Sequence, residues 1–438
     1  MMKKWCVFLF SVVPAFKRGT NQRKRKSLIL CVIPALVTLL FAGYAGASGF
    51  QLFEQNASGI GNAFAGSAAV AENAGTIFFN PAGMTKLQAR ELSLGVAAIK
   101  PSIKFSNNGS TNPLAFGGGS ATGTDGGDAG GWNYIPNAYL SLALTKDLYA
   151  GIGLSVPFGL ATEYDSDWYG RYQSIKFSIK TYNVNPTIAY RVNDKVSLGF
   201  GVNWQRLEAE YIRQATPTAQ VKLKADDDVW GWNVGALFQL SPSTRLGLSY
   251  RSAMAYTLNG DFSGAVNDPA KADIKLPDTA ILSVAQGLTD RWELLGDISW
   301  TGWSSLDTVD IINKNTGAVQ QQLIGKCTDA WRAALGTNYK LSDAWKLKFG
   351  IAYDESPVPD AQRRLVSLPD SNRTAFAAGV QWKPGKASTL DVGLEYVSMK
   401  GAEIENNQDS PAALAQGLVK GSYNSSALIL GAQYSMGF

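Results

Sequence analysis

The sequence predicts an all-β fold, a 14-stranded antiparallel transmembrane β-barrel with an N-terminal hatch (plug) in its lumen. Three observations predict this fold. Apolar residues alternate with small or polar residues, the alternating segments are long, and short connections alternate with long ones. The composition agrees with it, because 17% of the 438 residues are charged, against about 25% in soluble domains.

The alternation has a period of two residues. Apolar residues occupy every second position between residues 195 and 205, and the interleaved positions hold glycine or polar residues; the apolar set is Val196, Leu198, Phe200, Val202 and Trp204. Successive side chains of a strand point to opposite faces, so each such segment has one apolar face. No run of 18 apolar residues occurs after residue 47, which excludes membrane-spanning helices.

Segment length separates this pattern from a soluble β-sandwich, which alternates as well. The segments are about 10–16 residues long, whereas strands of soluble proteins have about 5–6 residues and membrane strands about 9–11. Aromatic residues also stand near segment ends, beside turns, which is typical of an interfacial girdle; examples are Tyr149, Trp292, Trp345 and Trp382.

The connections give the strand number. Six tight polar turns alternate with seven longer stretches, which makes 13 connections and 14 strands. An even number places both chain ends on the short-turn, periplasmic rim, as bacterial barrels require. We expect irregular loops at 106–131, 162–171, 214–228, 260–272, 304–326, 355–372 and 401–422.

Residues 1–47 have the pattern of a secretory signal peptide. They contain eight Lys or Arg and no acid, so removing them turns the formal net charge of +5 into −3. A basic tract at Arg23–Lys26 precedes the apolar run Leu28–Leu40 and an Ala-Gly-Ala ending, the order of parts in a signal peptide. We expect cleavage after Ala47. The stretch before Lys17 is unusually long, which leaves an extended signal or a misassigned start codon open.

The segment 48–88 lacks strand alternation and is rich in Gly, Ala and Ser. It also contains too many large apolar residues for a disordered tail, and a barrel of this width has room for a plug. We therefore expect three regions: a signal peptide at 1–47, a hatch at 48–88 and the barrel at 89–438.

Enzyme chemistry has little support in the sequence. The chain has no histidine, which excludes Ser-His-Asp and Cys-His catalysis and His-ligated zinc or haem. Cys327 is the one cysteine beyond the signal, so no internal disulfide is expected in an oxidising compartment. No nucleotide-binding loop motif occurs. We expect no enzyme activity, no cofactor, no metal site and no nucleic-acid partner.

Several motifs resemble those of FadL-type long-chain fatty acid transporters. The resemblance covers the mature chain in order, through Ser48-Gly-Phe-Gln-Leu52, Asn80-Pro-Ala82, Trp230-Gly-Trp-Asn233, Asp329-Ala-Trp-Arg332 and Gly350-Ile-Ala-Tyr-Asp-Glu-Ser-Pro-Val-Pro359. It implies a 14-stranded outer-membrane barrel plugged by a hatch. The family takes up long-chain fatty acids in one branch and monoaromatic hydrocarbons in another.

The third predicted strand contains Val156-Pro157-Phe158-Gly159. Proline cannot donate to the ladder and glycine weakens it, so a kink or bulge is expected there. The resemblance implies that this kink opens the barrel wall and lets ligand leave sideways, with Pro157 and Gly159 as gating residues and Phe158 beside the ligand. The alternative is that Pro157 lies at the outer end of the strand without such a role.

Two hatch positions carry expectations from the resemblance. Asn80 is expected near the ligand, with Pro81 beside it in the gate, and Phe50 near a mobile hatch terminus that releases ligand. On its own, Asn80-Pro81 indicates the start of a turn, and without the resemblance plain hatch packing is the favoured explanation for both Asn80 and Phe50.

A fatty acid needs a cation for its carboxylate, and guanidinium suits that group. Arg213 matches a basic pocket residue of the fatty-acid branch, although a solvated loop arginine is the alternative. The second basic residue of that branch corresponds to Leu323 here, with Lys326 nearby but out of register. This difference keeps neutral ligands possible.

We therefore expect a passive, monomeric outer-membrane transporter for long-chain fatty acids, surrounded by outer-membrane lipid and lipopolysaccharide. A transporter of monoaromatic hydrocarbons or other neutral compounds with the same fold is the alternative. A general porin and an outer-membrane hydrolase are further alternatives; the first conflicts with a plugged lumen, and the second with the absence of histidine.

Overall fold

A computed structural model describes residues 49–406 and 416–438, so the predicted signal peptide lies outside the described residues. The short helices are η1 (Ile60–Asn62), α2 (Thr76–Phe79), η2 (Pro81–Lys86), η3 (Leu114–Phe116) and η4 (Trp303–Ser305). The strands are β1 (Arg90–Asn107), β2 (Asn133–Ala143), β3 (Leu148–Ser155), β4 (Gly159–Glu163), β5 (Lys176–Arg191), β6 (Val196–Thr216), β7 (Ala219–Ser241), β8 (Thr244–Arg251), β9 (Met254–Gly264), β10 (Pro269–Leu276), β11 (Thr279–Gly287), β12 (Trp292–Thr301), β13 (Thr308–Asn313), β14 (Val319–Ile324), β15 (Ala330–Lys340), β16 (Trp345–Asp354), β17 (Arg373–Gly385), β18 (Ser388–Met399), β19 (Ala402–Asn406) and β20 (Val419–Gly437).

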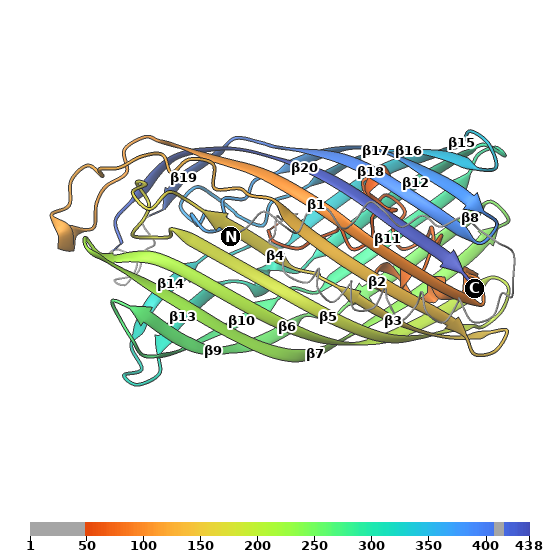
Figure 1. Ribbon diagram of the computed structural model, residues 1–438, viewed down its shortest axis with the longest axis horizontal. Coiled ribbons are helices and arrows are strands. Elements are labelled where there is room, and N and C mark those ends of the chain that lie inside the picture. Colours follow the sequence, from red (N-terminus) through yellow and green to blue (C-terminus); the bar gives the residue numbers. More distant parts are fainter. Residues whose placement is uncertain (1–48, 407–415) are drawn as a thin grey trace, which may run out of the picture. The chain divides into compact units, whose positions relative to one another are not determined.

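These strands close into a barrel (Figure 1). Neighbouring strands pair antiparallel all the way round, and β1 pairs with β20 from Glu91 opposite Gly437 to Asn107 opposite Gly421. Within the described residues six transmembrane strands are each built from two pieces, namely β3/β4, β8/β9, β10/β11, β12/β13, β14/β15 and β18/β19, so that twenty strands make fourteen crossings. The predicted fold and strand number are confirmed.

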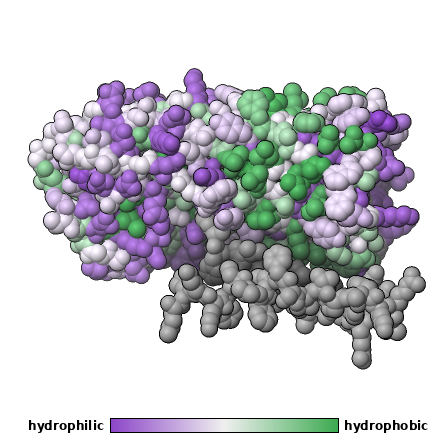
Figure 2. Space-filling model, turned by 45° about the horizontal axis from the view of Figure 1, so that its top comes forward, coloured by the Kyte–Doolittle hydropathy of each residue, from purple (hydrophilic) through white to green (hydrophobic). Residues whose placement is uncertain are grey.

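An apolar belt surrounds the barrel wall. Outward positions carry exposed Leu, Ile, Val and aromatic side chains, and Figure 2 shows them gathered toward one end, with hydrophilic residues covering the other. Aromatic pairs lie on the outward face near the short-turn rim, including Trp345 stacked on Trp382 at a centroid distance of 5.8 Å. The prediction for Tyr149 was wrong: it falls on the alternate face and is buried in the lumen against Ile77 and Met84.

The structure agrees with the predicted short turns at one rim, but it differs from several of the predicted loops at the other rim. The six tight turns join neighbouring strands at one rim, the right-hand end of Figure 1. At the other rim, the predicted loops 214–228 and 260–272 are largely strand, 304–326 is about half strand, and the described parts of 401–422 contain β19 and the start of β20. The β6–β7 hairpin, for example, turns between Thr216 and Ala219. These extensions alternate too, but their outward face carries charged side chains in place of apolar ones.

Residues 49–88 form the hatch inside the barrel, drawn in red and orange in Figure 1. Its backbone lies directly against small residues on the inner wall. A Cβ on Gly350 of β16, for instance, would stand 2.1 Å from the carbonyl carbon of Asn62. This close approach explains why glycine recurs on the inward face of the strands, where the sequence showed it interleaved with apolar residues.

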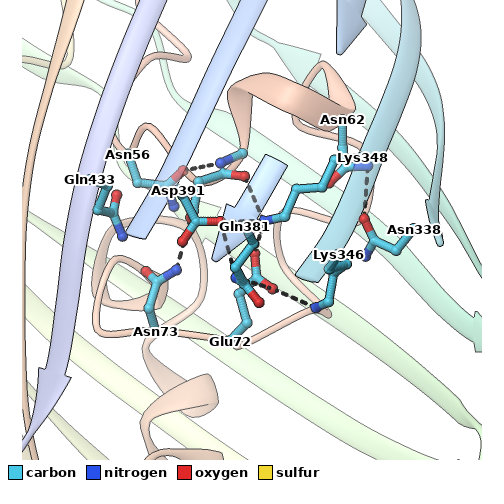
Figure 3. A network of polar contacts seen from close by, with 12 residues as sticks. Asn56, Asn62, Glu72, Asn73, Asn338, Lys346, Lys348, Gln381, Asp391 and Gln433 are labelled. Carbon is cyan, nitrogen blue, oxygen red and sulfur yellow. Dashed lines mark hydrogen bonds and ion pairs between the residues drawn. The ribbon is translucent and has the colours of Figure 1, made fainter. Parts of the chain in front are cut away.

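A buried charge network anchors the body of the hatch to the wall (Figure 3). Glu72 of the hatch contacts Lys348 of β16 and accepts a hydrogen bond from Lys346 Nζ at 3.2 Å. Lys348 also pairs with Asp391 of β18 at 2.9 Å and donates to the carbonyl oxygen of Ser58 at 3.0 Å. Burial alone would raise the pKa of Glu72, but the charges of Lys348 and Lys346 outweigh it and hold that pKa well below its usual range.

Candidate functional site

The third transmembrane strand is interrupted where Pro157 stands. β3 ends at Ser155 and β4 begins at Gly159. The ladder between β2 and the third transmembrane strand reaches only Ala138 opposite Leu154, and in the described part of the chain β4 pairs with β5 alone. The predicted interruption is present. On the side of β2 that faces the third transmembrane strand, the outer half of β2 has no ladder partner among the described residues.

The first residues of the hatch pair with the interrupted backbone. Leu52 N donates to Pro157 O at 2.8 Å, and Gly159 N donates to Phe50 O at 2.9 Å. Gln51 and Phe158 form an antiparallel bridge between these two bonds. The hatch therefore supplies hydrogen-bond partners that a continuous β2 ladder would otherwise supply, as buried backbone groups require.

A side chain completes this pairing. Gln55 donates through Nε2 to the carbonyl oxygen of Val156 at 2.7 Å and accepts from Val156 N at 3.0 Å. Thr181 of β5 binds both backbone groups of Phe158 from the other side, at 2.9 and 2.8 Å. With the hatch in place, the backbone groups at the interruption are therefore hydrogen-bonded. Without the hatch, several of them would have no partner.

Phe50 anchors the hatch segment in an apolar cluster. Its ring lies 4.9 Å from the Trp303 ring and 6.0 Å from the Phe158 ring, both edge-to-face. Gly49 has φ of +61°, and a Cβ there would stand 2.6 Å from Trp303, so only glycine fits before Phe50. Further inward-facing members of the cluster include Leu160, Ile179, Leu207, Tyr211, Leu223, Tyr256, Leu258, Phe262, Ile311 and Leu365.

Arg213 stands at the outer end of the same inner face. It lies two residues beyond Tyr211 on β6, hence on the same side of the strand. Its guanidinium makes long hydrogen bonds to carbonyl oxygens of Gln214 and Gln320, at 3.3 and 3.4 Å. No ion pair to Arg213 occurs among the described residues. Leu323 packs against the cluster, whereas Lys326 is exposed.

Asn80 and Pro81 lie in the body of the hatch. Asn80 is fully buried, caps η2 by accepting from Ala82 N at 3.1 Å, and donates to Ala68 O and Ala236 O at 2.7 and 3.0 Å. None of these partners belongs to the apolar cluster around Phe50. The structure thus brings Phe50, Phe158, Pro157 and Gly159 together, and leaves Asn80 and Pro81 outside that group.

Three functional candidates escaped sequence reasoning. Trp303 lies in the 3-10 helix η4 after β12, which turns its side chain into the lumen beside Phe50. Asp370 and Arg373 form a buried ion pair against Gly49. The sequence contained a signal in Leu368-Pro-Asp-Ser-Asn-Arg373, because two opposite charges three residues apart stand at the start of β17.

Comparison with known proteins places the chain in a family. A family model described as "Outer membrane protein transport protein (OMPP1/FadL/TodX)" matches residues 38–438. The chain is 27% identical over 435 residues to the long-chain fatty acid transport protein of Escherichia coli K12, covering 88% of this chain and 95% of that one. It is 29% identical over 418 residues to outer membrane protein P1 of Haemophilus influenzae, covering 84% and 90%.

Solved structures support the fold. A FadL homologue from Pseudomonas aeruginosa superposes with a TM-score of 0.81 at 22% identity, covering 89% of this chain and 99% of that one. The toluene transporter TodX of Pseudomonas putida gives a TM-score of 0.66 at 16% identity, covering 87% and 98%. The matched family is described as one of transport proteins, and the Escherichia coli relative and TodX are named as transporters, in line with the sequence prediction of no enzyme activity. The chain belongs to the outer membrane transport protein family that includes FadL and TodX, and it is a β-barrel of the bacterial outer membrane.

Proposed function

We propose that this protein takes up long-chain fatty acids by passive diffusion and releases them sideways into the membrane at the interrupted third strand. A fatty acid gains about 0.8 kcal/mol for each CH₂ that leaves water, so the apolar cluster around Phe50 and Trp303 suits its chain. Arg213, with no ion pair among the described residues, suits its carboxylate.

The observation that carries this proposal is the pairing of residues 50–52 with residues 157–159. The hatch segment covers the stretch where β2 and the third transmembrane strand lose their ladder. Movement of that short segment would uncover an exit without displacing the hatch body, which the Glu72–Lys348–Asp391 network anchors.

A deletion tests the exit. Removal of Pro157 and Phe158 keeps the inward and outward alternation of the third strand but restores a continuous ladder. We expect oleate uptake by cells lacking their own transporter to be lost, while the purified protein still binds oleate. Uptake at the level of the unmodified protein would contradict lateral release.

The same fold could serve neutral ligands, and one observation favours that alternative. Leu323 corresponds to the position where the fatty-acid branch has its second basic residue, and its side chain packs against the apolar cluster. Relatives of the chain include both a fatty acid transport protein and a toluene transporter. A comparison of oleate and toluene binding separates the two proposals.

We also propose that the strand extensions lie in the lipopolysaccharide layer. Their outward faces carry cross-strand ion pairs, such as Arg206 with Asp226 at 2.7 Å and Lys222 with Glu210 at 2.7 Å. Such faces suit a hydrated, charged sugar layer and not hydrocarbon. The mature protein would begin at Ser48 and act as a monomer; N-terminal sequencing and the mass of the detergent-solubilised protein test these two points.

A further inference from the structure

Glutamine side chains lie at the outer end of the apolar cluster around Phe50. Gln321 of β14 and Gln416 hydrogen-bond to each other in both directions, with Gln321 Nε2 donating to Gln416 Oε1 at 3.1 Å. Gln321 Nε2 also donates to the hydroxyl oxygen of Tyr211 at 3.2 Å. The Tyr211 ring belongs to the apolar cluster, and its hydroxyl donates to the carbonyl oxygen of Gln173. These four side chains are buried, so a polar layer of amides meets the apolar cluster at Tyr211.

Gln173 lies beside Arg213 in this layer. Residues 171–175 run alongside residues 212–214 of β6, and backbone hydrogen bonds of 2.7 and 2.8 Å join the two stretches at their ends. Arg213 is the cation of the proposed carboxylate site. The amide of Gln173 is therefore the nearest addition to that site that the loop before β5 can supply.

One polar atom of Gln173 has no partner. Its Nε2 donates to Asn406 O at 2.8 Å and to Gly417 O at 3.0 Å, which fixes the orientation of the amide because only its nitrogen can donate. Its Oε1 is buried and has no hydrogen-bond partner among the described residues. A buried acceptor without a partner costs free energy, so this oxygen favours a ligand that brings a donor.

We propose that Arg213 and Gln173 together bind the hydroxyl head group of a long-chain alcohol, which makes long-chain alcohols a second substrate class of this transporter. The inference rests on the proposed function and adds a substrate class to the same site. A hydroxyl can accept a hydrogen bond from the Arg213 guanidinium and donate one to Gln173 Oε1. An ionised carboxylate only accepts, so a fatty acid uses Arg213 and leaves Gln173 Oε1 without a donor.

Equilibrium binding to the purified protein in lipid nanodiscs tests this proposal, with radiolabelled oleyl alcohol, oleate and octadecene as probes. All three carry a long hydrocarbon chain, and octadecene has no oxygen. We expect the unmodified protein to bind oleyl alcohol at least about threefold more tightly than octadecene, because the hydroxyl adds hydrogen bonds in a buried site. Equal affinities for these two probes would overturn the proposal without any variant.

A variant assigns the effect to Gln173. Gln173→Leu should weaken binding of oleyl alcohol about threefold to tenfold, as expected for one neutral hydrogen bond, and leave the oleate affinity unchanged. Gln322→Leu is the matched control, because Gln322 binds Asp310 at 2.7 Å and not the glutamine layer; it should leave both affinities unchanged. Equal losses for alcohol and oleate in Gln173→Leu would refute the hydroxyl site.

The two levels of the proposal fail in different ways. Oleate binding without a preference for oleyl alcohol over octadecene would refute the alcohol site alone. Absence of oleate binding to the unmodified protein would refute the proposed function as well.

Discussion

Leu52 donates its backbone N–H to the carbonyl oxygen of Pro157 across 2.8 Å. A residue at the start of the hatch thus occupies the hydrogen-bonding place that a neighbouring strand would take in an uninterrupted wall. The third transmembrane strand and the hatch segment are consequently one structural unit, and a change in either should alter both ligand release and the stability of the segment.

Phe50 should hold this unit closed. Phe50→Ala removes a ring packed against Trp303 and Phe158, and such truncations cost about 3–5 kcal/mol in a packed core. We expect exchange of the Leu52 amide to accelerate by at least tenfold, while the midpoint of thermal unfolding of the barrel stays within a few degrees. Exchange unchanged from the unmodified protein would contradict the anchoring role of Phe50.

Arg213 should discriminate ligands by charge. Arg213→Met removes the cation and keeps an aliphatic side chain, so the affinity for oleate should fall about tenfold to 100-fold, while toluene affinity stays the same. Lys326→Met, which changes an exposed lysine nearby, is the control and should leave both affinities unchanged. Equilibrium binding to the purified proteins provides the measurement; unaltered oleate affinity in Arg213→Met would remove the carboxylate role.

Docking of the hatch segment should depend on pH through Glu54. Burial raises the pKa of the Glu54 carboxyl from 4.5 to about 7. The charges of Arg332 and Arg373 oppose this rise, and the charge of Asp354 adds to it. Glu395 of β18 also faces Glu54. The docked state binds the proton more tightly, so docking is strongest below about pH 4.5. It weakens as the pH rises toward 7, by about 3 kcal/mol in all.

Amide exchange of residues 49–55, corrected for the intrinsic pH dependence of exchange, measures this effect. Protection should fall between pH 4.5 and 7 and level off above it. Glu54→Gln should remove the dependence and stay protected throughout. A pH-independent profile in the unmodified protein would show that Glu54 does not control docking.

The hatch body should depend on Lys348. Lys348→Met leaves Glu72 and Asp391 buried without their shared cation, and breaking a buried pair in this way costs about 3–5 kcal/mol. We expect ion leakage through the barrel in planar bilayers. Lys346→Met removes a more exposed partner of Glu72 and should leak less. If neither variant conducts ions, contacts other than those of Lys348 and Lys346 hold the hatch in place.

The sequence was sufficient for the barrel because period-two alternation and turn spacing report directly on strand faces and connections. It failed where the alternation continued with charged instead of apolar outward residues. The β6–β7 hairpin continues past the apolar belt with Lys222 and Asp226 on its outward face, and charged residues at these positions suggest a loop. It also misplaced Tyr149, since an aromatic near a turn can face either side. The Gly49–Asp370 contact joins residues 321 positions apart, which no local pattern reveals.

A reversible cross-link tests the central claim most directly. Gln51 and Phe158 are antiparallel bridge partners, and cysteines at such positions meet the spacing that a disulfide needs. In a Cys327→Ser background, Gln51→Cys with Phe158→Cys would tie the hatch segment over the interruption when oxidised. We predict that the oxidised protein binds oleate but does not transport it, and that reduction restores transport. Equal transport in the oxidised and reduced forms would contradict lateral release beneath a mobile hatch segment.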